Sequence, residues 1–214
     1  MFKQFNYFDN FIFDLDGTLV DSSAEILMCL EKAFNECNVK FDKAKLTSDI
    51  MGPSLAEIVK LVIPTLNDSD VIQNIVIKYR ALYDNDPDDK TQLYEGIIEW
   101  LSYLKSNKKK FFIATNKPKI PTMRLVQKLN IDFFNDIYTT DKYDCKKLTK
   151  YQMIKEIISK HSLVKEKTIM VGDILSDIDA AHKAGIQTIG ALWGYSDNKN
   201  LLTEKSEFII KRLK

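Results

Sequence analysis

Five short apolar runs constrain the fold of this chain more than any other feature of its sequence. The runs are rich in residues that favour β-strands, and most are separated by segments in which apolar residues recur with the period of a helix. They span Phe11–Leu15, Phe111–Ala114, Ile137–Thr140, Thr168–Gly172 and Thr188–Leu192. Alternating strands and helices predict an α/β fold with a parallel sheet flanked by helices.

The spacing of the runs predicts an inserted domain. Almost a hundred residues separate the first run from the second, which is far more than one crossover connection needs. Apolar residues within this stretch keep helical spacing over Ile26–Cys37, Leu55–Val62 and Val71–Leu82. We therefore expect residues 1–21 and 92–214 to form the α/β core and residues 22–91 to form a small all-helical domain.

An acidic motif follows the first apolar run. Asp14 and Asp16 lie two residues apart, so both can face the same side where the strand ends and the backbone turns at Gly17. Two adjacent carboxylates repel each other, and a hard divalent cation such as Mg²⁺ relieves that repulsion through oxygen ligands. The carboxyl end of a parallel strand is also where open α/β sheets bind ligands.

A second acidic motif follows the run Thr168–Gly172. Asp173 and Asp177 lie there in a Gly-Asp-x-x-x-Asp pattern. An Asp-rich turn by itself is more often only a turn former. Two such turns at the ends of neighbouring strands favour a metal site formed by Asp14, Asp16 and Asp173.

The sequence Asp14-Leu15-Asp16-Gly17-Thr18, together with the second motif, resembles the haloacid dehalogenase superfamily. The resemblance covers nearly the whole chain and implies a Rossmann-like, three-layer core with a helical cap, as in the phosphoglycolate-phosphatase-like subgroup. It also implies that Asp14 is a nucleophile, that Asp16 is the acid and base and binds the metal through its backbone carbonyl, and that Asp177 orients the groups around the metal.

The resemblance also suggests where the substrate phosphate is bound. The family has a Ser or Thr after its second strand, and Thr115, followed by Asn116, occupies that position. Without that role, both would be turn residues ahead of a helix. The family lysine corresponds to the stretch Lys146–Lys150, which lacks the usual prolines; its register favours Lys147 and leaves Lys146 as an alternative.

The expected function is that of a Mg²⁺-dependent phosphatase for a small phosphomonoester such as phosphoglycolate, a sugar phosphate or a nucleotide, acting through an aspartyl-phosphate. Two other functions stay open from the sequence. A sugar-phosphate mutase similar to β-phosphoglucomutase would pass the phosphoryl group to a second hydroxyl, and a non-catalytic phosphate-binding protein would keep only the fold. The sequence leaves open which phosphomonoester is used.

The composition limits the kinds of binding partner and the cellular setting that we expect for this protein. With 31 Lys and Arg against 30 Asp and Glu, the chain has a net charge of +1, which gives no electrostatic reason to expect nucleic acid or a membrane surface as a partner. Three cysteines without a C-x-x-C pair favour a reducing, cytoplasmic setting, and the aromatic N-terminus lacks the apolar region of a signal peptide. We expect a monomer or homodimer.

Overall fold

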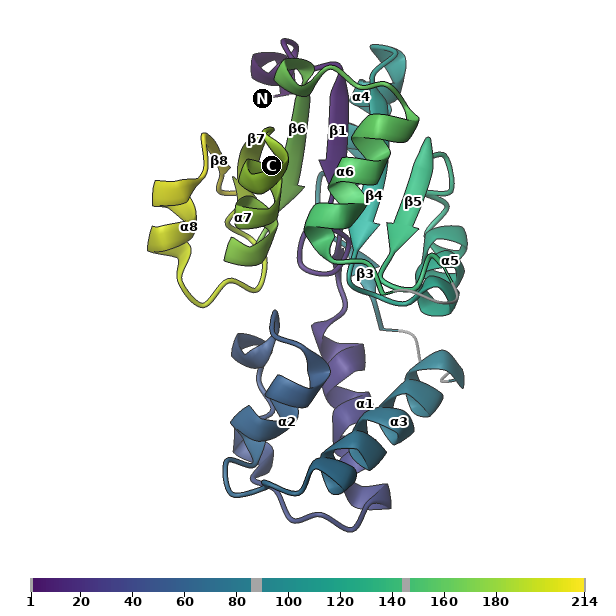
Figure 1. Cartoon of the computed structure of the whole chain (residues 1–214), viewed down its shortest axis with the longest axis vertical. Coiled ribbons are helices and arrows are strands. Elements are labelled where there is room, and N and C mark those ends of the chain that lie inside the picture. Colours follow the sequence, from purple (N-terminus) through teal and green to yellow (C-terminus); the bar gives the residue numbers. More distant parts are fainter. Residues whose placement is uncertain (1, 86–89, 144–146, 214) are drawn as a thin grey trace. The chain divides into compact units, whose positions relative to one another are not determined.

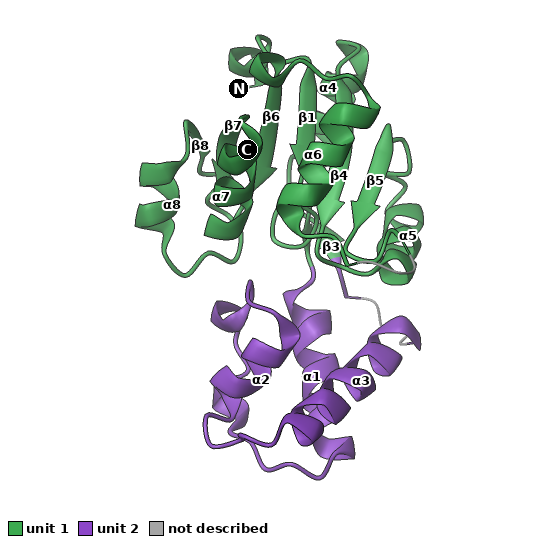
Figure 2. Ribbon diagram, viewed as in Figure 1, with its two compact units in different colours: residues 1–21, 92–214 green, residues 22–91 purple. Residues whose placement is uncertain are grey.

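A computed structural model of the chain describes residues 2–85, 90–143 and 147–213. The chain divides into two compact units, shown in green and purple in Figure 2. The first unit comprises Met1–Asp21 and Gln92–Lys214, and the second comprises Ser22–Thr91.

The first unit contains a six-stranded sheet in which all neighbouring strands are parallel (Figure 1). Its strands, in spatial order, are β5 (Asp136–Thr139), β4 (Lys110–Thr115), β1 (Asn10–Phe13), β6 (Thr168–Gly172), β7 (Gln187–Ala191) and β8 (Phe208–Ile210). The first five coincide with the predicted runs, and the three-residue β8 has no predicted counterpart. Chain order reverses between β1 and β6, which is the switch point where sheets of this kind bind ligands.

Helices cover both faces of this sheet because successive strand residues point to opposite sides. Phe13 packs on one face with Trp100 and Leu125, whereas Ile12 packs on the other face with Ile154. The helices of this unit are α4 (Ile97–Ser106), α5 (Lys119–Lys128), α6 (Lys150–Lys160), α7 (Leu175–Ala184) and α8 (Lys199–Lys205). The predicted three-layer α/β fold is therefore confirmed. Across the described residues, no helix combines the length and the apolar composition needed to cross a bilayer.

The second unit is built from helices around a core of its own. Its α-helices are α1 (Ser23–Glu36), α2 (Leu55–Val62) and α3 (Ser69–Asn85). The buried residues Phe34, Val59 and Ile75 bring the three helices together. Ser54 and Glu57 form a capping box that satisfies backbone N–H groups at the start of α2. Residues 22–91 thus bury an apolar interior within themselves.

A two-stranded ribbon joins the segments on either side of the second unit. In this ribbon, β2 (Val20–Asp21) pairs antiparallel with β3 (Gln92–Leu93). Val20 also forms a bridge with Asp16, so the ribbon continues directly from the first acidic motif. The chain therefore leaves and re-enters the first unit at adjacent points.

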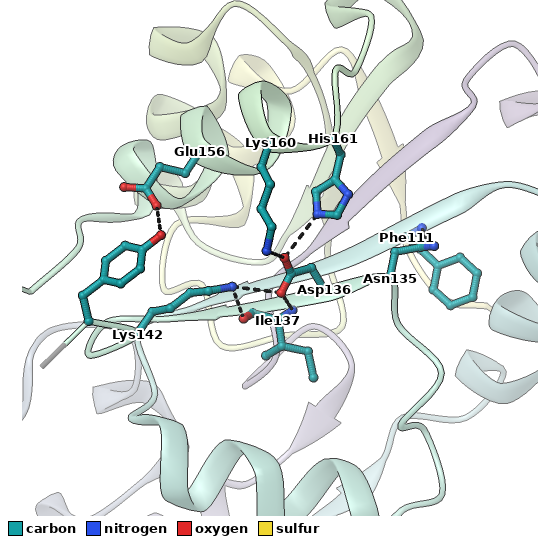
Figure 3. Close-up of polar contacts among 9 residues, drawn as sticks. Phe111, Asn135, Asp136, Ile137, Lys142, Glu156, Lys160 and His161 are labelled. Atoms are coloured by element: carbon teal, nitrogen blue, oxygen red, sulfur yellow. Dashed lines mark hydrogen bonds and ion pairs between the residues drawn. The ribbon is translucent and has the colours of Figure 1, made fainter.

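The free edge of the sheet at β5 carries a polar network around Asp136 (Figure 3). Lys142 Nζ donates to Asp136 Oδ1 at 2.8 Å and to the carbonyl oxygen of Ile137 at 3.0 Å. Lys160 Nζ lies 2.7 Å from Asp136 Oδ2, and His161 Nε2 lies 3.2 Å from the same oxygen. Partial burial by itself would raise the pKa of Asp136, but these three partners outweigh it and hold the pKa well below its usual value.

Candidate active site

Three neighbouring strands bring predicted site residues to the same edge of the sheet. Asp14 follows β1, Thr115 is the last residue of β4, and Asp173 follows β6. Because β4, β1 and β6 are adjacent and parallel, their carboxyl ends lie together. The site therefore lies at the switch point of the sheet.

The turn after β1 is shaped to receive Asp173. Gly17 has a φ of +86°, which L side chains rarely adopt, and a Cβ there would stand 2.2 Å from Asp173 Oδ2. The next residue, Thr18, donates its hydroxyl to Asp173 Oδ1 at 2.8 Å. Glycine followed by threonine thus allows the two acidic motifs to meet.

Three buried carboxylates form a cluster at this point. One oxygen from each of Asp14, Asp173 and Asp177 lies within 4.8 Å of the others. Asp177 is fully buried, and its Oδ2 accepts no hydrogen bond from the described residues. Its approach depends on Gly172, where a Cβ would stand 2.4 Å from Asp177 Cβ. An all-oxygen, acidic cluster with an unsatisfied buried oxygen has the chemistry of a site for a hard divalent cation.

The positive charge within this cluster comes from Lys150, the first residue of α6. Its ammonium lies 2.5 Å from Asp14 Oδ1 and 3.0 Å from Asp177 Oδ1, and it donates to the carbonyl oxygen of Ala114 at 2.9 Å. Burial by itself would lower the pKa of Lys150, but the charges of Asp14 and Asp177 outweigh this effect and raise it. Lys150 is therefore a cation fixed beside the predicted nucleophile.

The structure places Lys150 where the sequence analysis expected Lys147. Lys147 is exposed, and Lys146, the alternative, lies outside the described residues. Two signals in the sequence indicate that Lys150 begins the helix on its buried face, although neither shows which carboxylates it contacts. The pair Thr149 and Gln152 forms a capping box, which starts the helix at Lys150. Lys150 also precedes the buried Met153 and Ile154 by three and four residues, so it shares their buried face.

The loop after β4 contributes a second lysine to the site. Lys117 Nζ lies 2.9 Å from Asp16 Oδ1, and the Lys117 N–H donates to Thr115 Oγ1 at 3.0 Å. Thr115 is buried, as expected of a residue at the end of a central strand, whereas Asn116 is exposed. The Asp16 carboxylate thus pairs with Lys117, while the three-carboxylate cluster is formed by Asp14, Asp173 and Asp177.

The electrostatics of the cluster favour a bound cation. Burial raises the pKa of Asp14 well above its usual value despite the attraction of Lys150, and the charges of Asp177 and Asp173 raise it further. Burial and the charge of Asp177 likewise raise the pKa of Asp173 to about 7, although Tyr195 N–H and Thr18 donate to it. Carboxylates this close are stable as anions only with added positive charge.

A loop after β7 fixes Asp173 from the other side. The Tyr195 N–H donates to Asp173 Oδ2 at 2.8 Å, and Trp193 Nε1 donates to the carbonyl oxygen of Thr18 at 3.0 Å. Between them, Gly194 lies so close that a Cβ would stand 2.2 Å from Asp173 Cβ. The sequence analysis did not include this loop among the site residues. The adjacent aromatic residues around a glycine directly after the last predicted strand were its signal.

Known proteins resemble this chain in sequence and in fold. Residues 11–191 match the family model for haloacid dehalogenase-like hydrolases. A haloacid dehalogenase-like family hydrolase from Streptococcus pneumoniae has a solved structure that superposes with a TM-score of 0.84 at 30% identity, covering 97% of this chain and 95% of that one. The phosphoglycolate phosphatase of Aquifex aeolicus is 29% identical over 187 residues, which are 86% of this chain and 84% of that protein.

A further relative is longer than this chain. The tyrosine-protein kinase PtkA of Mycobacterium tuberculosis is 26% identical over 184 residues, and the match spans 62% of that protein against 86% of this chain. Its remaining part has no counterpart in the match. The family model covers most of the chain, including both acidic motifs and the strands that carry them. The chain therefore belongs to the haloacid dehalogenase-like hydrolases.

Proposed function

We propose that this hydrolase is a phosphatase that cleaves a small phosphomonoester through a phosphoaspartate formed on Asp14. The observation that carries the proposal is the buried Asp14 at the end of the central strand, held beside Lys150 and clustered with Asp173 and Asp177. A phosphomonoester is dianionic, so it approaches a carboxylate only where positive charge offsets the repulsion.

The charges of the site match one divalent cation. Among the described residues, Asp14, Asp16, Asp173 and Asp177 carry four negative charges when ionised, and two lysines that form ion pairs with them, Lys117 and Lys150, carry two positive charges. The remainder of two negative charges and the oxygen-only donor set favour Mg²⁺. We infer that Asp14 and Asp173 hold it, with the Asp16 backbone carbonyl as the family resemblance implies and with Asp177 beside them. Bound Mg²⁺ would neutralise charge on the phosphoryl oxygens.

The residues of the chain then have distinct parts in two half-reactions. Asp14 attacks phosphorus, the bond from phosphorus to the ester oxygen breaks, and Asp16 gives a proton to the departing oxygen. In the second half, Asp16 takes a proton from water, whose oxygen attacks phosphorus and releases Asp14. Lys150 and Thr115 stabilise the phosphoryl oxygens throughout.

The comparisons support a small substrate. The Aquifex relative is named for phosphoglycolate, and a sugar phosphate or a nucleotide would offer the same dianionic group. Phosphoryl transfer to a second hydroxyl, as in a sugar-phosphate mutase, would use the same Asp14. Incubation with a hexose 1-phosphate separates the two reactions, since a mutase yields the isomeric sugar phosphate and a phosphatase yields free phosphate.

The deciding experiment is a hydrolysis screen over small phosphate esters with Mg²⁺, comparing the wild type with Asp14→Asn. We expect phosphate release by the wild type, none by the variant, and an acid-stable phosphate adduct on Asp14 detected by mass spectrometry after rapid quenching. Turnover by Asp14→Asn at the normal rate would contradict the nucleophile.

The choice of metal is tested by replacing Mg²⁺ with Ca²⁺ or with excess chelator. Ca²⁺ is larger and takes more ligands, so it would engage both oxygens of Asp14 and disturb the geometry of attack. We expect activity with Mg²⁺ and inhibition by Ca²⁺. Full activity in excess chelator would contradict the metal assignment.

A further inference from the structure

We propose that Lys117 is the positioning residue for Asp16: its buried ammonium fixes the carboxylate, and its backbone is anchored to the phosphate-binding Thr115. This inference rests on the proposed function, in which Asp16 is the acid and base.

The ion pair between the two residues is asymmetric in burial. The Lys117 side chain is 6% exposed and the Asp16 side chain is 22% exposed, with Nζ 2.9 Å from Oδ1. An ammonium enclosed to this degree is stable only with an anionic or polar partner. Burial therefore restricts the Lys117 side chain, and its ammonium in turn holds the more accessible Asp16 carboxylate.

The backbone around Lys117 is also held on both sides. The Lys117 N–H donates to Thr115 Oγ1 at 3.0 Å, and Thr122 Oγ1 donates to the carbonyl oxygen of the next residue, Pro118, at 2.7 Å. Thr122 is fully buried in the first turn of α5. Pro118, whose ring fixes φ, separates Lys117 from that helix. The short segment from Thr115 to Pro118 therefore fixes the position of the Thr115 hydroxyl and, through the Lys117 ammonium, that of the Asp16 carboxylate.

Fixing Asp16 matters because it acts twice at one position. It must lie within hydrogen-bond distance of the leaving oxygen in the first half-reaction and of the attacking water in the second. A carboxylate that is free to change rotamer would spend less time in either geometry. Loss of Lys117 should therefore slow both proton transfers and leave substrate affinity nearly unchanged.

The test compares Lys117→Met, which keeps the length of the side chain without its charge, with Lys117→Arg and with Lys119→Met. Lys119 is exposed two residues further along, so its variant is a matched control for the loss of one lysine. Each variant is assayed with an alkyl phosphate, whose leaving oxygen needs a proton, and with p-nitrophenyl phosphate, whose leaving oxygen does not.

For the alkyl ester, we expect Lys117→Met to lower kcat by about 10-fold to 100-fold, because general acid and base catalysis is of this order or larger. KM should change by less than about 2-fold, Lys117→Arg should recover part of kcat, and Lys119→Met should match the wild type. With p-nitrophenyl phosphate the first step is spared and the second is slowed, so phosphoenzyme should accumulate in rapidly quenched samples.

A double-mutant cycle with Asp16→Asn completes the test. If Lys117 acts through Asp16, adding Lys117→Met to Asp16→Asn should change kcat by less than about 2-fold. A raised KM with unchanged kcat would overturn the inference, because it would show that Lys117 binds the substrate itself. If the wild type is active and Lys117→Met is equally active, this inference is wrong and the proposed function stands. If the wild type hydrolyses none of the esters, both the inference and the proposed function are wrong.

Discussion

At the scale of single residues, Lys150 forms ion pairs with two carboxylates of the site. Its ammonium contacts both Asp14 and Asp177, and its side chain is 6% exposed. We expect Lys150→Met to lower kcat/KM by more than about 100-fold, because it removes a preorganised charge facing the phosphoryl group. Lys147→Met, an exposed change in the same segment, should stay within about 2-fold of the wild type.

Steady-state kinetics on folded variants, checked by circular dichroism, test this assignment. Breaking a buried ion pair can destabilise a protein by about 3–5 kcal/mol, so the unfolding midpoint of each variant is needed as a control. The reverse ranking, with Lys147→Met inactive and Lys150→Met active, would return the role to Lys147.

Asp136 is the second residue whose charge we expect to affect a measured quantity, here the free energy of unfolding. It is the first residue of β5, at the amino end of that strand and away from the site. Its pKa is lowered by Lys142, Lys160 and His161, so the folded state binds a proton less readily than the unfolded state. The resulting stability is fully present above the unfolded pKa of about 4 and is lost as the pH falls toward the folded value.

We therefore expect Asp136→Asn to lower the free energy of unfolding by about 1 kcal/mol at neutral pH, a modest value because Lys160 is largely exposed. The difference from the wild type should shrink below about pH 4. Urea unfolding at several pH values measures it, with the exposed Asp132→Asn as the control. A difference independent of pH would contradict the ion-pair explanation.

At the scale of elements, the loop after β7 determines whether Asp173 reaches the site. A Cβ on Gly194 would stand 2.2 Å from Asp173 Cβ and 2.3 Å from the Gly17 carbonyl oxygen. We expect Gly194→Ala to cost about 1–3 kcal/mol in stability, because the backbone has to shift, and to weaken Mg²⁺ binding as Asp173 moves.

Gly185→Ala separates these two effects. Gly185 ends α7 with a φ of +78°, so alanine is strained there, but among the described residues its Cβ would meet Lys165 alone, with Nζ 3.4 Å away. It should therefore lower stability without changing metal affinity. Urea unfolding and calorimetric titration with Mg²⁺ measure the two quantities, and equal Mg²⁺ affinity in the two variants would contradict the role of the loop.

At the scale of the whole molecule, the helical unit of residues 22–91 has its own core, and the chain connects it to the first unit through the paired strands β2 and β3. We propose that this unit is a cap that restricts the site to small substrates. The wild type should then hydrolyse small phosphate esters with a far higher kcat/KM than a phosphopeptide.

Replacing residues 22–91 with a short Gly/Ser linker tests this proposal. Val20 pairs with Leu93 and Asp21 pairs with Gln92, so a short linker can join the two strands without strain. We expect the shortened protein to lose its preference for small esters. Unchanged discrimination would show that specificity comes from the loops of the first unit.

The sequence by itself determined the sheet and the strand-end positions of three predicted site residues. Five of the six strands were predicted because each is a short apolar run with turn residues at its end, and β8 was not because three residues carry too little pattern. Asp14, Thr115 and Asp173 were predicted at strand ends for the same reason: parallel strands bring their carboxyl ends to one edge. Local pattern and sheet topology are sufficient for such positions.

Only the tertiary structure decided which charges pair. Lys147 and Lys150 are both lysines in one polar segment, and Lys117 follows a turn that any chain could expose. Their roles depend on which side chains are buried beside Asp14 and Asp16, and on how closely Gly194 approaches Asp173. Such contacts join residues far apart in the chain, and burial sets their strength, so the order of residues along the chain does not encode them locally.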